Sequence, residues 1–81
     1  MSKHAKTLEK MRNNPRDWHI DDLVTLALHY QIEIRNAGGS HYVFSHPGIT
    51  QTLSVPAHRP IKPVYTRQFV GLIDSVKEQQ S

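Results

Sequence analysis

The chain has 81 residues, a net charge of +3 at pH 7 and no cysteine. Its length suits a single domain, since chains divide into domains of roughly 100–200 residues, and the lack of cysteine excludes disulfides and thiolate metal ligands. No apolar run approaches the roughly 18 residues that span a bilayer, and the polar, basic N-terminus lacks the apolar stretch of a signal peptide. We therefore expect a small cytoplasmic domain with one modest core and no membrane partner.

Positive charge gathers in two stretches of the sequence. Residues 1–16 carry five Lys or Arg side chains against one acid, and no acid lies between Glu33 and Asp74. The second stretch contains Arg35, His41, His46, His58, Arg59, Lys62 and Arg67. Such a surface suits a polyanion, for example a nucleic-acid backbone, although a basic surface that serves only solubility has the same composition.

Hydrophobic spacing predicts two helices in the N-terminal part of the chain. Residues 2–13 space their apolar side chains by threes, and Pro15 with the asparagines before it interrupts the pattern. A better helical pattern covers residues 20–30 and begins with two aspartates near its positive end. Trp18, just ahead of it, is expected to fold back into the core, with stacking on a nucleic-acid base as the alternative.

The period of the pattern then changes to two, which indicates strands. Residues 32–35 and 40–46 alternate on either side of a turn and predict a hairpin. A third strand is predicted for residues 50–55, and a last helix begins near Pro63. The order α-α-β-β-β-α predicts an α+β domain, in which helices cover one face of a three-stranded antiparallel sheet.

The six histidines do not show the spacing of a metal site. His41 and His46 lie an odd number of residues apart in one predicted strand, which points them to opposite faces. No histidine pair has the helical or short-turn spacing of a zinc site. Neither a structural nor a catalytic metal is therefore expected.

A single well-placed imidazole is enough for acid–base chemistry, because histidine gains and loses its proton near neutral pH. His41 opens the second predicted strand directly after Gly38 and Gly39, which let a substrate backbone approach closely. Ser40 adds a hydroxyl group beside it. His41 is therefore the candidate catalytic residue, and the alternative is an ordinary solvent-facing strand histidine.

On an RNA substrate the expected step is attack of the 2′-hydroxyl oxygen on the adjacent phosphate. His41 would remove the hydroxyl proton, and Arg35, Lys62 or the glycine amides would stabilise the phosphoryl charge. Strand alternation puts His41 and Val43 on one face of the sheet and Tyr42 and Phe44 on the other.

Three motifs in a fixed order give the chain a resemblance to a known family. They are Gly39–Phe44 with His46–Pro47, then Ser54–His58, and then Thr66 in the first turn of the last helix. This pattern resembles the HicA toxins of bacterial toxin–antitoxin pairs, over about residues 22–76. The resemblance implies a fold similar to a double-stranded-RNA-binding domain, metal-independent cleavage of messenger RNA without a cofactor, and His41 as the catalytic residue.

The resemblance also implies a protein partner and a substrate-binding set. A HicB-type antitoxin would cover the active site and keep His41 from RNA. His58 falls on the family's recurrent loop histidine, which would contact the substrate or support the site, or else serve in capping or packing. The expected substrate-binding residues are Arg35, Gly38, Gly39, Ser40, His58, Arg59 and Lys62.

Two departures separate the chain from the family pattern. Tyr65 stands before Thr66 where members often have glycine, which could alter how the last helix starts. Residues 1–18 form an N-terminal extension ahead of the HicA-like domain at residues 19–81. The extension would enlarge the partner surface or contact RNA through its lysines, or remain a solvated basic helix.

Two other functions stay open beside the ribonuclease. A double-stranded-RNA-binding-like fold can read the shape and phosphates of RNA without chemistry, and would then tolerate loss of His41. A structural or protein-interaction domain would show no affinity for RNA at low salt. The oligomeric state is not determined by the sequence pattern.

Overall fold

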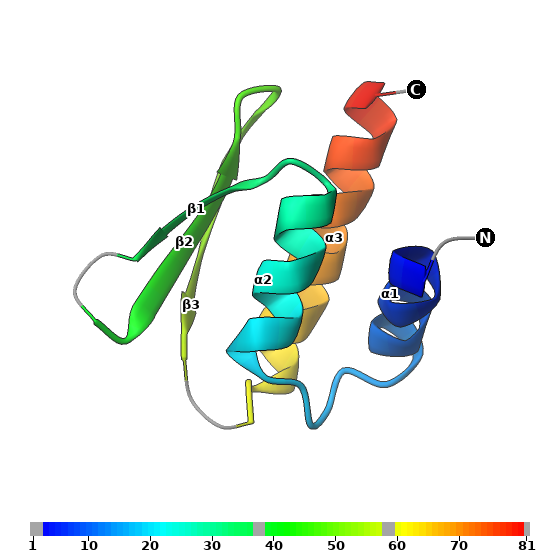
Figure 1. The fold of residues 1–81 in the computed structure, drawn as a ribbon, viewed down its shortest axis with the longest axis vertical. Coiled ribbons are helices and arrows are strands. Elements are labelled where there is room, and N and C mark those ends of the chain that lie inside the picture. The colour runs from blue at the N-terminus through cyan, green and yellow to red at the C-terminus, as the bar shows by residue number, and fades with distance from the viewer. Residues whose placement is uncertain (1–2, 37–38, 58–59, 81) are drawn as a thin grey trace.

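The computed structural model describes residues 3–36, 39–57 and 60–80 (Figure 1). The elements in chain order are α1 (Lys3–Asn13), α2 (Ile20–His29), β1 (Glu33–Asn36), β2 (His41–His46), β3 (Ile49–Pro56) and α3 (Pro63–Gln80). The strands form one antiparallel sheet in the order β1-β2-β3. The helices lie on one side of the sheet (Figure 1), so the predicted α+β architecture is confirmed.

Local hydrogen bonds determine where α2 begins and ends. The backbone N–H of His19 donates to the Asp22 carboxylate at 3.0 Å, which satisfies a donor at the helix start. At the other end, Gln31 takes a left-handed backbone conformation with φ of 61°. The N–H of Ile32 then donates to the carbonyl of Ala27 at 2.8 Å, which is the helix-ending arrangement that glycine usually provides. Because Ile32 is used in this cap, β1 begins one residue later than predicted.

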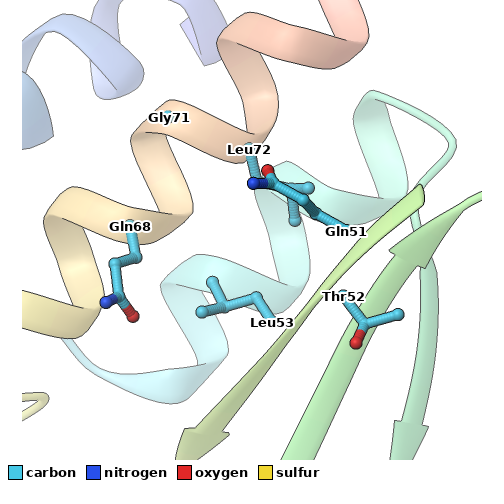
Figure 2. A pocket seen from close by; sticks show the side chains of 6 residues that line it. All are labelled: Gln51, Thr52, Leu53, Gln68, Gly71 and Leu72. Carbon is cyan, nitrogen blue, oxygen red and sulfur yellow. The ribbon is translucent and has the colours of Figure 1, made fainter. Parts of the chain in front are cut away.

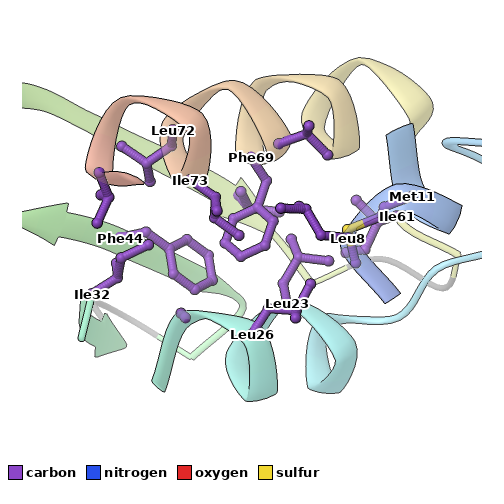
Figure 3. Close-up of a cluster of buried hydrophobic side chains, with 14 residues drawn as sticks. Leu8, Met11, Leu23, Leu26, Ile32, Phe44, Ile61, Phe69, Leu72 and Ile73 are labelled. Atoms are coloured by element: carbon purple, nitrogen blue, oxygen red, sulfur yellow. The ribbon is translucent and has the colours of Figure 1, made fainter. Parts of the chain in front are cut away.

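The core fills the space between the sheet and the helices. Phe44 of β2 and Phe69 of α3 are fully buried, and their rings meet edge to face with centroids 5.2 Å apart (Figure 3). Trp18 packs against the same cluster and donates its indole N–H to the carbonyl of Asn14 at 2.6 Å, which agrees with the packing interpretation. The buried apolar residues are Leu8, Met11, Leu23, Leu26, Ala27, Ile32, Phe44, Val55, Ile61, Phe69, Val70, Leu72, Ile73 and Val76.

The N-terminal helix α1 shares this core. Its Leu8 and Met11 are fully buried, which is more than a solvated basic helix requires. The Arg12 guanidinium also donates two hydrogen bonds of 2.8 Å to the two carboxylate oxygens of Asp74 on α3. The hydrogen bonds from Arg12 hold the pKa of Asp74 below its ordinary value of 3.8. The ion pair between Arg12 and Asp74 and the two buried apolar side chains of α1 therefore hold the N-terminal extension against the rest of the domain.

The strand register determines which side chains share each face of the sheet. Phe44 lies opposite Ile34 on β1 and opposite Leu53 on β3, so these three side chains belong to the inner face that meets the helices. Because side chains alternate along a strand, His41 and Val43 belong to the outer face. His41 is exposed, as its predicted face requires.

Candidate functional site

His41 is held at the very start of β2. Its cross-strand neighbour is Pro56, near the end of β3. One residue before it, the carbonyl of Ser40 accepts a 2.7 Å hydrogen bond from the N–H of Ala57. This bond extends the β2–β3 ladder past His41, so β2 is paired with β3 both before and after the residue that carries the imidazole. The side chain itself is exposed on the outer face.

The turn into β2 depends on a glycine. Gly39 has φ of +80°, a conformation that residues with a side chain rarely adopt. A Cβ atom added there would meet no atom within 4 Å, so the requirement comes from the backbone conformation and not from packing. The open space beside Gly39 is compatible with close approach of a ligand backbone. Gly38, which was predicted together with it, lies outside the described residues.

Arg35 joins His41 on the outer face. It lies opposite Val43, two residues along β2 from His41, so the two side chains are diagonal neighbours on the same surface. Diagonal pairs in an antiparallel sheet are about 7–8 Å apart, a separation that a phosphate group and its sugar can span. On the other side of Val43, β3 contributes the exposed hydroxyl of Ser54. Ser54 was named in the sequence only as the first residue of a motif and was given no role in the site, because only the register places it beside this group.

The remaining predicted residues follow β3. His58 and Arg59 lie outside the described residues. Lys62 is exposed immediately before α3, and its carbonyl accepts hydrogen bonds from Tyr65 at 2.9 Å and Thr66 at 3.3 Å. Lys62 thus belongs to the first turn of α3 and not to the sheet face, so the structure brings Arg35 together with His41 but gives Lys62 a separate position.

The other described histidines have local structural contacts. The rings of His4 and His29 stack between α1 and α2 with centroids 4.0 Å apart, and His46 Nδ1 accepts a 3.0 Å bond from the N–H of Gly48. The backbone of His19 takes part in the α2 cap. His41 has neither a ring contact nor a hydrogen bond to another side chain in the part of the chain that the structure describes. Among those residues, no three His, Cys, Asp or Glu side chains are grouped to hold a metal ion.

A groove of about 490 Å³ lies away from His41, between the edge of β3 and α3 (Figure 2). Leu53 enters it from β3, and Gln68 and Leu72 come from α3 (Figure 2). Its lining is uncharged and consists of Gln51, Thr52, Leu53, Gln68, Gly71 and Leu72. Sequence reasoning missed this feature; the available signal was Gly71, a glycine within a helical pattern.

Comparison with known proteins does not assign the chain to a family. No family model matches it, and neither the curated proteins nor the solved structures contain a match. Within the described ranges, no helix combines the length and apolar character needed to cross a membrane. The site is therefore defined by its own geometry: an exposed histidine beside an arginine on the sheet face that the helices leave open.

Proposed function

We propose that the chain is the toxin of a type II toxin–antitoxin pair, a metal-independent endoribonuclease of the HicA type that cleaves messenger RNA with His41. The observation that carries the proposal is the position of His41, exposed at the start of β2 and diagonal to Arg35 on the outer face. Two of the HicA-like motifs meet at the start of β2, since Gly39 and Ser40 precede His41 and Pro56, near the end of β3, lies opposite it. Among the described residues, no side-chain hydrogen bond or ring contact of the fold uses this imidazole.

The proposed reaction uses the 2′-hydroxyl of the RNA as the nucleophile. His41 accepts the hydroxyl proton as the oxygen attacks the adjacent phosphorus, and the bond to the 5′-oxygen of the next nucleotide breaks. The product carries a 2′,3′-cyclic phosphate, and the departing 5′-oxygen takes up a proton. Arg35 stabilises the negative charge on the phosphoryl oxygens as it increases.

The experiment is degradation of RNA by the purified chain in the presence of EDTA, with the His41→Ala variant in parallel. The wild type is expected to cleave, and the variant to lose about 10²–10⁴-fold in turnover while it still binds RNA. His46→Ala is the matched control, because His46 also lies on β2 but uses its ring to accept a hydrogen bond from the following turn. Equal cleavage by wild type and His41→Ala would refute the catalytic role.

The proposed regulator is a HicB-type antitoxin that covers His41. The positively charged surface around His41 and Arg35 attracts acidic side chains of a protein for the same reason that it attracts phosphates. Saturating antitoxin should therefore abolish cleavage, and association should slow as salt is raised. Full cleavage at saturating antitoxin would contradict this mode of control.

A non-catalytic RNA-binding module is the second candidate, and one observation favours it. Among the described residues, the titratable side chain that strand register places next to His41 on the outer face is Arg35, and a guanidinium is too weak an acid to protonate the leaving oxygen. A binder of this kind would leave RNA intact in both wild type and His41→Ala and bind with similar affinity. The cleavage assay, combined with a binding measurement, therefore separates the two functions.

A further inference from the structure

We propose that the outer face of the sheet binds one unpaired base of the RNA, on a subsite formed by Val43 and Ser54. The base belongs to the nucleotide whose 2′-hydroxyl attacks, so the inference rests on the proposed ribonuclease function. Val43 is partly buried and pairs with Arg35 on β1 and with Ser54 on β3. His41 lies two residues before it on the same strand and therefore on the same face. An apolar side chain thus has polar neighbours in three directions.

The spacing of these residues suits a single nucleotide. Neighbouring strands lie about 4.8 Å apart, so about 10 Å separate Arg35 from Ser54, with Val43 midway between them. Two residues along β2 cover about 7 Å, which separates Val43 from His41. A base that lies flat on Val43 has the hydroxyl of Ser54 at one edge, and its ribose extends along β2 to His41. The phosphate that follows this ribose is within reach of the Arg35 guanidinium, which is diagonal to His41.

Ser54 supplies a polar group that the fold does not use. Its side chain is exposed, and its hydroxyl makes no hydrogen bond with any other described residue. The hydroxyls of Thr7 and Thr25, in contrast, donate to backbone carbonyls at 3.1 and 2.9 Å. A serine hydroxyl both donates and accepts hydrogen bonds, so Ser54 can bond with polar groups at the edge of any base. It therefore contributes affinity for the bound base and does not select among the four bases.

The charges of the outer face favour a single strand over a duplex. Among the described strand residues, Glu33 and Arg35 are the charged side chains of this face beside the imidazole of His41, and β3 carries no charge. Glu33 lies beyond Arg35 on the side away from His41, where it repels a phosphate. A duplex carries about one charge per 1.7 Å of its axis and binds through many phosphate contacts. One arginine next to an acid suits one phosphate, and the bases of a single strand are free to turn toward protein side chains.

The first experiment measures the affinity of the full chain for a single-stranded oligonucleotide that has fluorine in place of every 2′-hydroxyl and so cannot be cleaved. Ser54→Ala should weaken binding about 2–10-fold, as expected for the loss of one hydrogen bond. Its control is Ser75→Ala, because Ser75 lies on α3, on the other side of the sheet from this face. The duplex of the same sequence should bind the wild type more weakly than the single strand does.

The second variant strengthens the subsite. Val43→Phe puts an aromatic ring, which strands accommodate well, under the base and should tighten binding at least about fivefold, because bases stack on aromatic side chains. Leu28→Phe is the control, since Leu28 is also an exposed apolar residue but lies on α2. Unchanged affinity in both Ser54→Ala and Val43→Phe, with native circular dichroism, would overturn the proposal. Tighter binding of the duplex than of the single strand would overturn it as well.

Cleavage of unmodified RNA by the same variants in EDTA separates this proposal from the ribonuclease function. Ser54→Ala should raise KM by about the factor by which it weakens binding and change kcat less, since the bond to the base is present before and during the reaction. A wild type that shows the expected binding pattern yet leaves RNA intact would contradict the ribonuclease and support the base subsite. Cleavage by the wild type with KM unchanged in Ser54→Ala and in Val43→Phe would support the ribonuclease and contradict the subsite.

Discussion

The inner and outer faces of the sheet differ in what their side chains contact, although both are built by alternate residues of the same strands. Phe44 on the inner face is fully buried against α3, whereas Val43 beside it lies on the open face between Arg35 and Ser54. The inner face therefore supplies stability, and the outer face is free to present His41. Adjacent residues on one strand can thus serve different purposes, and the comparison can be tested one substitution at a time.

The largest expected effect distinguishes the two faces by stability. Phe44→Ala removes a buried ring and should lower the free energy of unfolding by about 3–5 kcal/mol. Val43→Ala, one residue away on the open face, should cost about 1 kcal/mol or less. Denaturant unfolding of both variants measures the difference. Losses of similar size would mean that the outer face is covered by something besides solvent.

The next effect concerns RNA binding by the outer face. Arg35→Gln should weaken binding several-fold and lower the slope of log affinity against log salt by about one, as expected when one phosphate contact is lost. Lys6→Gln on α1 is the control, since Lys6 is exposed on a helix that packs on the other side of the core. Filter binding at several salt concentrations measures both. If Lys6→Gln lowered the affinity for RNA more than Arg35→Gln does, the RNA would bind α1 and not the outer face.

A smaller effect on stability is expected from the ion pair that joins α1 to α3. Asp74→Asn should lower the free energy of unfolding by about 0.5–1 kcal/mol at pH 7, because the ion pair with Arg12 is partly exposed to solvent. Since the folded-state pKa of Asp74 lies below 3.8, the stabilisation is complete above that pH and is lost as the pH falls through the folded-state value. The wild type and the variant should therefore converge in acid. A difference that persists there would exclude the carboxylate as its source.

The smallest effect is a gain in stability. The hydroxyl oxygen of Thr66 is buried and has no hydrogen-bond partner in the described structure, so Thr66→Val should stabilise the fold by up to about 1 kcal/mol. Thr25→Val is the control, because the Thr25 hydroxyl is exposed and donates to the carbonyl of Asp21 at 2.9 Å. Thermal unfolding should show a higher Tm for the first variant alone. A loss of RNA cleavage in Thr66→Val without a loss of stability would instead give this hydroxyl a role in the site.

The fold was predictable from the sequence because local patterns determine it. Alternation placed Phe44 and His41 on opposite faces, and Pro63 correctly marked the start of the last helix. The end of β3 was less accurate: the strand includes Pro56, because its nitrogen faces the free edge and no ladder bond is lost.

Features that depend on distant parts of the chain were not predictable. The register that places Arg35 diagonal to His41 depends on the geometry of the intervening turn, which residue types alone do not determine. The bond between Arg12 and Asp74 joins residues 62 positions apart. The groove between β3 and α3 likewise requires the packed structure. His41 could be selected from its chemistry and motif, but its surroundings could not.

The most direct test is to measure unfolding and RNA turnover on the same preparation of His41→Ala. Because the imidazole is exposed on the open face, the free energy of unfolding should change by no more than about 0.5 kcal/mol. Turnover in EDTA should nevertheless fall to background. A variant that unfolds easily would show that His41 serves the fold, and a stable variant that still cleaves RNA would show that the open face does not use this histidine for chemistry.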